Sequence, residues 1–290
     1  LGGTLAIRSE PAARVMSSLG TSLGLDAAAA AEGVLRVAEA RVEAALRVVS
    51  VERGKDPRGH ALLSFGGAGP LHQGRLARDL GCPVSIVPPN PGVLAALGLL
   101  MAPASVDAAR THVRDLGTVT AGELEAAWGA LEGEARSMLA EKDGSERLVR
   151  SADCRYRGQA YELAVPAPDG IPAAIAAAFH QAHLERYGYI QPQETVEIVN
   201  LRVRVEGPDP DLPLPRLSPG RGATAALAGT RRVVLEGEER DCPVFRRDGL
   251  GEGDQIGGPA ILAGLDSTCL ILEGQRADVD VLGNLLIRER

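Results

Sequence analysis

The fold class of this chain is decided by the stretch Ala61-Leu62-Leu63-Ser64-Phe65-Gly66-Gly67-Ala68-Gly69-Pro70-Leu71-His72. Its apolar beginning predicts a strand over 61–65, and Pro70 suits the first turn of a helix that ends at Gly81. The small residues between them predict a tight turn in which backbone N–H groups can approach a ligand closely. From spacing alone, a phosphate- or nucleotide-binding turn and an empty turn both remain open, because the pattern is neither a Walker A loop nor GxGxxG.

Helices and strands alternate on both sides of this turn. A helix is predicted over 26–50 with Asp26 as its N-cap, and a strand over 84–87 precedes a helix over 93–101. The first of these helices carries an apolar stripe at helical spacing, made of Val34, Leu35, Ala38, Val42, Ala45, Leu46 and Val49. This alternation is typical of an α/β fold.

The pattern changes near residue 105. Further along, the sequence predicts a short strand at 111–113, helices over 120–141 and 171–187, two strands within 146–165 around Gly158, and an alternating strand over 195–205. A proline-rich connector at 208–222 leads to short strands separated by glycines, which are typical of a small β-barrel or sandwich. We expect one domain over 1–105 and a C-terminal α+β domain over 106–290, with a sub-boundary near 210.

Composition narrows the class of protein. A length of 290 residues suggests about two domains, and a net charge of −7 argues against a basic nucleic-acid-binding surface. Apolar runs are far shorter than the ~20 residues that span a bilayer. No basic, apolar signal peptide opens the chain, and the missing initiator Met suggests a piece of a longer polypeptide. We expect a cytoplasmic protein.

The cysteines and histidines give no strong site by themselves. The cysteines are Cys82, Cys154, Cys242 and Cys269; they form no CxxC pair, so we interpret them as reduced and buried, and we expect no metal. His180 and His183 share one helix face, where seating the helix or an interface is favoured over metal binding.

Three further patterns give weaker signals. His72, one turn into the glycine-turn helix, could contact a ligand, but a lone histidine is more often structural. The stretch Leu1-Gly2-Gly3-Thr4 lacks the acidic residue and the strand of a phosphate loop. No serine-hydrolase motif is present.

Several longer stretches resemble the hydantoinase/5-oxoprolinase family, specifically the C-terminal part of its ATP-handling (hydantoinase A-type) subunit. They run in family order over nearly the whole chain: 48–54 with 56–58, the Phe-Gly-Gly-Ala-Gly-Pro-Leu-His block at 65–72, 87–100, 155–163, 179–180 through 187–189, and 257–261. The block at 65–72 is the most specific of them.

The resemblance implies an actin-like ATPase (RNase H-like) lobe, followed by a mixed α+β region and a small β-rich C-terminal domain. By this match the nucleotide-contacting residues are Gly66, Gly67, Ala68, Gly69 and His72, with Pro91, Gly92 and Gly98 shaping the next turn of the same wall. The cofactors implied for the complete subunit are ATP and Mg²⁺. No catalytic residue can be assigned.

The family's activity is the ATP-dependent opening of a cyclic amide: a hydantoin, 5-oxoproline or a related lactam. A ketone (acetone- or acetophenone-type) carboxylase subunit and a non-catalytic assembly module are the alternatives. The implied partners are the N-terminal half of the same subunit, a second hydantoinase B-type subunit or domain within a hetero-oligomer, and a small-molecule substrate, but neither nucleic acid nor membrane.

This sequence also departs from the family pattern. The phosphate-gripping loops and their metal-binding carboxylates are missing, Ala95 stands where the family usually has Ser, and the pattern at 41–45 is unusual. Because nothing here would hold the γ-phosphate, we expect the isolated chain to be inactive as an ATPase.

Overall fold

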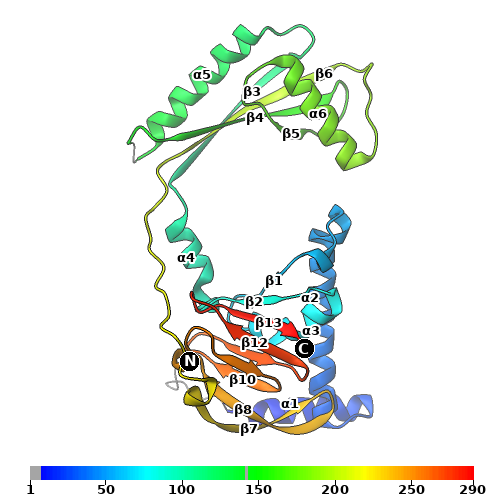
Figure 1. Ribbon diagram of the computed structural model, residues 1–290. Helices are drawn as coiled ribbons and strands as arrows, with labels where there is room; N and C mark the ends of the chain where they lie inside the picture. Colours follow the sequence, from blue (N-terminus) through cyan, green and yellow to red (C-terminus); the bar gives the residue numbers. More distant parts are fainter. Residues whose placement is uncertain (1–7, 141–142) are drawn as a thin grey trace. The chain divides into compact units, whose positions relative to one another are not determined.

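The computed structural model describes residues 8–140 and 143–290, so Leu1-Gly2-Gly3-Thr4 lies outside the described residues. The chain forms two compact units (Figure 1). Unit 1 combines the beginning of the chain, up to Leu99, with Pro213–Arg290, and unit 2 is Leu100–Leu212. Each unit is described by itself below.

The first part of unit 1 alternates helices and strands as the sequence predicts. Its elements are α1 (Glu10–Leu23), α2 (Ala27–Val49), β1 (Leu62–Leu63), α3 (Gly69–Leu80), β2 (Ser85–Val87) and α4 (Leu94–Met101), with short 3₁₀ turns at Val51–Arg53, Pro57–Gly59 and Pro91–Val93. The side chain of Asp26 accepts a hydrogen bond from the N–H of Ala29, which confirms it as the N-cap of α2. Gly81 ends α3 in the left-handed conformation that favours glycine.

The C-terminal part of unit 1 is made of short strands. They are β7 (Leu227–Leu235), β8 (Glu238–Arg246), β9 (Gln255–Gly257), β10 (Ala260–Ala263), β11 (Thr268–Ile271), β12 (Gln275–Val279) and β13 (Leu285–Glu289), with 3₁₀ turns at Ala223–Ala226 and Arg247–Gly249. The strand β2 pairs in parallel with β1 and antiparallel with β13, giving a sheet of order β1-β2-β13-β12-β9. In Figure 1 the red C-terminal strands lie beside the cyan β2.

This arrangement differs from the division expected from the sequence. The C-terminal strands do not form a separate barrel or sandwich, because β9, β12 and β13 complete the sheet that β1 and β2 begin, while β11-β10-β8-β7 form a second sheet. A core of apolar side chains joins the early and late segments, among them Val87 from β2 and Leu262, Ile271 and Ile287 from the C-terminal strands. The region from β1 to β2 therefore packs against strands that belong to Pro213–Arg290.

Unit 2 is one antiparallel sheet covered by two helices. Its elements are β3 (Ser105–Asp115), α5 (Ala121–Met138), β4 (Arg147–Tyr156), β5 (Leu163–Pro166), α6 (Pro172–Tyr187) and β6 (Val196–Glu206), and the strand order is β3-β6-β4-β5. The strand predicted at 111–113 is much longer, because β3 pairs with β6 along nearly its whole length. Thr120 and Glu123 form a capping box that begins α5.

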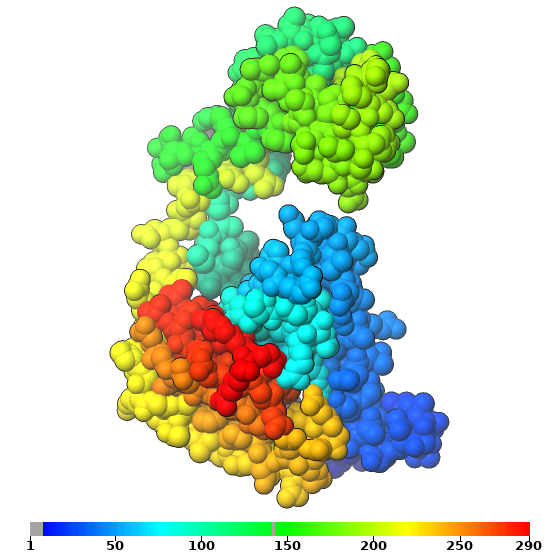
Figure 2. All heavy atoms as spheres, turned by 45° about the vertical axis from the view of Figure 1, so that its right-hand side comes forward, coloured from blue at the N-terminus to red at the C-terminus, as the bar shows by residue number. Residues whose placement is uncertain are grey.

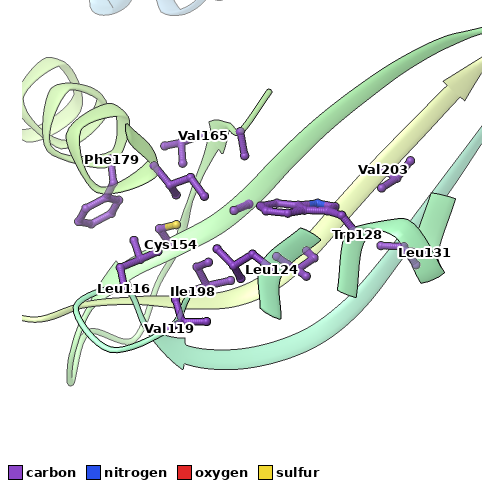
Figure 3. Packing of buried hydrophobic residues seen from close by; sticks show 14 of the residues in the cluster. Leu116, Val119, Leu124, Trp128, Leu131, Cys154, Val165, Phe179, Ile198 and Val203 are labelled. Carbon is purple, nitrogen blue, oxygen red and sulfur yellow. The ribbon is translucent and has the colours of Figure 1, made fainter. Parts of the chain in front are cut away.

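The core of unit 2 lies between its sheet and both helices (Figure 3). Trp128 and Leu124 of α5 and Phe179 of α6 are completely buried there. The alternation predicted for this strand is present in β6, where Leu201, Val203 and Val205 are buried in this core while the intervening arginines are exposed. A register shift beside Asp153 and Cys154 breaks the alternation, so Ile198 is buried whereas Val199, two residues before Leu201, is only half-buried.

The apolar stripe predicted on α2 is not buried in unit 1. Only Ala30 and Glu39 of this helix are buried, whereas Val34, Val42 and Val49 are 45–55% exposed. Figure 2 shows the blue atoms of this helix at the surface of unit 1. Helix α4 likewise has no buried residue. In the part of the chain that the structure describes, no helix has the length and apolar character needed to cross a membrane.

The cysteines are all free thiols in the structure. Cys154, Cys242 and Cys269 are buried as expected, and burial raises the pKa of Cys154 and of Cys269 to about 12. Cys82 is only half-buried. Such high pKa values keep the buried thiols protonated and unreactive at neutral pH.

We predict that Leu124→Ala lowers the free energy of unfolding of unit 2 by about 2–5 kcal/mol, because it leaves a cavity in a fully buried core. Trp128 is the only tryptophan of the chain and lies in the same core, so its fluorescence during urea unfolding reports on unit 2. Met138→Ala on the same helix is the matched control, since Met138 is 65% exposed. An equal effect of both substitutions would contradict the assigned core.

Candidate functional site

The glycine turn begins where β1 ends. Ser64 is buried, and its N–H donates to the carbonyl of Ile86, which extends the pairing of β1 with β2. Gly66 follows with φ +82°, a left-handed conformation that side chains disfavour. At Gly69, the first residue of α3, an added Cβ would lie 3.2 Å from the hydroxyl oxygen of Ser64. Strand and helix are therefore so close at this corner that a side chain at position 69 would require Ser64 to shift by a few tenths of an ångström.

A second turn is tied to the first by a backbone hydrogen bond. The N–H of Gly66 donates to the carbonyl oxygen of Pro91 at 2.7 Å. Pro91 is buried and begins the 3₁₀ turn between β2 and α4. The structure thus brings together Gly66 and Pro91, which the family resemblance implies are parts of one wall.

A carboxylate that the sequence analysis did not identify lies against both turns. Asp266, between β10 and β11, accepts a 2.7 Å hydrogen bond from the N–H of Gly92 through its Oδ2. An added Cβ at Gly92 would approach this Oδ2 to 2.8 Å, and one at Gly67 would lie 3.6 Å from the Asp266 backbone oxygen. Three segments that are distant in sequence therefore meet at this corner of unit 1.

The glycine turn after β1 also contains backbone N–H groups that can bind a ligand. Across residues 8–140 and 143–290, no acceptor is found for the backbone N–H groups of Gly67 and Ala68. Both groups lie immediately before α3, whose own N-terminal N–H groups carry a partial positive charge. This corner can therefore donate hydrogen bonds to an electronegative or anionic group.

For two of the predicted site residues, His72 and Gly98, no side-chain contact with this corner is found among the described residues. The Nδ1 of His72 lies 3.1 Å from the carboxylate of Glu39, on α2. The same carboxylate binds Arg75, which also pairs with Glu32 at 2.6 Å. His72 therefore joins an ion-pair network that fastens α3 to α2. Gly98 lies on α4, with nothing within 4 Å of its Cβ position.

The two histidines of α6 take part in hydrogen bonds that hold unit 2 together. His183 is fully buried, and its Nδ1 lies 2.9 Å from the carbonyl oxygen of Tyr189. The Nδ1 of His180 lies 2.7 Å from the hydroxyl of Tyr156, and that hydroxyl also accepts from the N–H of Gln191. These bonds fasten α6 and the turn that follows it to β4, as the helix-seating interpretation requires. No cluster of three metal-ligating side chains occurs among the residues described.

Comparison with known protein families accounts for both parts of the chain. Residues 1–108 match the family described as hydantoinase/oxoprolinase, and residues 114–289 match the hydantoinase/oxoprolinase C-terminal domain. The chain belongs to the hydantoinase/oxoprolinase family. The resemblance carried by the glycine block and the later motifs is thereby confirmed.

Among individual relatives, the alpha subunit of caprolactamase from Pseudomonas jessenii is 30% identical over 97% of this chain. The protein 5-oxoprolinase 1 from Arabidopsis thaliana is 29% identical over 89% of it. The chain spans 42% of the length of the former and 21% of the latter. It is thus similar to one part of longer proteins.

Solved structures support the fold. The crystal structure of the ATP-dependent caprolactamase from Pseudomonas jessenii matches all of this chain with a TM-score of 0.83 and 28% identity, over 44% of that protein's chain. A nucleotide-free acetone carboxylase structure matches 99% of this chain and 44% of its own, with a TM-score of 0.77. At 21% identity the second match shows the mixed α/β fold alone.

We predict that Gly67→Val weakens nucleotide binding at least tenfold, because a branched side chain would cover the free N–H groups. Gly67 has no left-handed φ and its Cβ position has ordinary van der Waals space, so the variant should fold. Gly129→Ala, in open space on α5, is the matched control. Titration of the complete protein with ADP measures the effect, and an unchanged affinity of the valine variant would remove the turn from the site.

Proposed function

We propose that this chain is the C-terminal portion of a hydantoinase A-type subunit whose complete form opens a cyclic amide with the use of ATP. The substrate class is a hydantoin, 5-oxoproline or a related lactam. The observation that carries the proposal is the glycine turn at the N-terminus of α3, with two N–H donors that no group in the described chain occupies. The relatives named for ATP-dependent lactam chemistry support it.

In this proposal unit 1 contains the second lobe of an actin-like ATPase. The parallel β1–α3–β2 arrangement supports this, because the turn at the carboxyl end of a strand is where such folds bind ligands. Gly67 and Ala68 donate their N–H groups to the nucleotide, and the Pro91–Gly92 turn forms the adjoining wall. His72 does not contact the nucleotide in this proposal; its interaction with Glu39 fixes α3 to α2.

The nucleotide fits this corner because Gly67 and Ala68 are exposed and have little side chain to cover their N–H groups. When bound, ATP would supply a phosphoryl group to the amide oxygen and leave as ADP; water could then attack the carbonyl carbon, with opening of the C–N bond and release of phosphate. This chain's residues bind and orient the nucleotide at its nucleoside end. The groups that hold the γ-phosphate and Mg²⁺ belong, in the proposal, to a preceding segment of the longer protein.

Exposed apolar side chains on α2 and α4 support the proposal that a preceding segment of the longer protein packs against unit 1. Val34, Val42 and Val49 of α2 and Leu99 of α4 are between 45% and 78% exposed. So many large apolar side chains on a protein surface are typical of an interface. We propose that the preceding half of the same subunit covers α2, and that a hydantoinase B-type subunit completes the enzyme.

A ketone carboxylase subunit is the second candidate. The acetone carboxylase beta subunit of Xanthobacter autotrophicus is 25% identical over 94% of this chain. Both candidate functions assign the same nucleotide-binding role to the glycine turn, so only the substrate distinguishes them. Bicarbonate-dependent consumption of a ketone would support the carboxylase, and release of an amino acid from a lactam would support the hydrolase.

We predict that the complete subunit, joined to its B-type partner, releases ADP in step with ring opening of one member of a panel of hydantoin, 5-oxoproline and caprolactam. The isolated 290-residue chain should release no phosphate above a preparation from cells carrying an empty vector. Robust turnover by the isolated chain, or ring opening without ATP, would contradict the proposal.

We also predict that Val42→Asp weakens association of this chain with the separately expressed preceding half at least tenfold, because it places a charge in an apolar contact. Arg41→Asp on the same turn is the matched control, since Arg41 is an exposed polar position outside the stripe. Sedimentation or calorimetry measures the affinity. Equal affinities for both variants would exclude α2 from the interface.

A further inference from the structure

We propose that Asp266 is a positioning residue of the nucleotide site, which holds the Pro91–Gly92 turn in place beside the glycine turn. This inference rests on the proposed function and adds to it a third element, the β10–β11 turn over 264–267. The glycine motifs give no sign of this element, because Asp266 lies 174 residues after Gly92 in the chain.

The contact is a hydrogen bond to a charged acceptor in a crowded place. The 2.7 Å bond from the N–H of Gly92 to Oδ2 of Asp266 has the short length typical of charge-assisted hydrogen bonds. The Cβ and backbone oxygen of Asp266 also lie 3.0 Å from the place where a Gly92 Cβ would stand. A side chain at position 92 would therefore collide with Asp266, so this close contact requires glycine at position 92.

The β10–β11 turn is itself held rigidly. The N–H of Gly264 donates to the carbonyl of Ser267 at 2.9 Å, which closes the turn that carries Asp266. Its flanking strands pair residue by residue from Ala260 with Ile271 to Ala263 with Thr268. Asp266 therefore extends from a fixed support rather than from a flexible loop.

A second contact from the C-terminal segment braces the other end of the same turn. Arg247 donates from Nη2 to the carbonyl of Val87 at 2.8 Å and to that of Gly283 at 3.2 Å. Val87 is the last residue of β2, directly before the Pro88–Gly92 stretch. Arg247 is half-buried, and this burial lowers the pKa of its guanidinium. The stretch between β2 and α4 is thus fixed at both ends by residues of Pro213–Arg290.

Exposed apolar side chains adjoin each of the three turns. Phe65 precedes Gly66, Val93 follows Gly92, and Leu265 precedes Asp266; they are 50%, 54% and 76% exposed. Apolar surface next to N–H donors is the combination that a heterocyclic base with a sugar requires. Asp266 therefore acts by fixing the wall of a nucleoside subsite, and removing its carboxylate should loosen that wall.

The test uses the complete subunit with its partner, and measures ADP affinity by calorimetry and KM and kcat for ATP. We expect Asp266→Ala to raise the Kd for ADP and the KM for ATP at least tenfold, with kcat changed less than about threefold. Asp266→Asn keeps an acceptor for the Gly92 N–H and should recover most of the affinity. Asp248→Ala is the matched control, because Asp248 is exposed and pairs with Arg246 at 2.6 Å.

The outcomes separate this inference from the proposed function. Wild-type ADP affinity in Asp266→Ala would overturn the role of Asp266 and leave the nucleotide site in place. A fall in kcat as large as the rise in KM, with no recovery in Asp266→Asn, would overturn it in favour of general destabilisation. A wild-type protein that binds no ADP would overturn the proposed function and this inference together.

Discussion

The structure of unit 1 depends on how two backbone N–H groups are satisfied. The N–H of Gly66 is bound by the carbonyl of Pro91, and the N–H of Gly92 is bound by the carboxylate of Asp266. These two bonds join the turn after β1, the turn after β2 and the β10–β11 turn into one corner. The N–H groups of Gly67 and Ala68 remain available there, and the proposed nucleotide chemistry follows from that availability.

Local patterns in the sequence predicted most of the elements but not how they assemble. Asp26, Gly81 and Gly158 mark ends or turns because their capping or left-handed conformations are local properties. The pairing of β13 with β2 could not be predicted, because partners 198–202 residues apart leave no local trace. The same holds for the length of β3, which its long-range pairing with β6 determines.

The candidate site was predictable to a similar extent. The glycines of the turn stand out because strand, small residues and helix follow one another directly. The partner of His72 was not evident, since Glu39 lies on a different helix, 33 residues earlier. Asp266 sits in an ordinary hairpin sequence with no signal of its role. The apolar stripe on α2 was evident from the spacing of its residues, but most of its large side chains are exposed in unit 1, which the spacing alone could not indicate.

The most direct measurement of the central claim is hydrogen–deuterium exchange of the complete subunit with and without ADP. We predict that ADP slows exchange in three peptides together, covering 62–70, 88–94 and 262–268, while peptides from α5 are unchanged. Slower exchange elsewhere in the subunit with none at the glycine turn would contradict it.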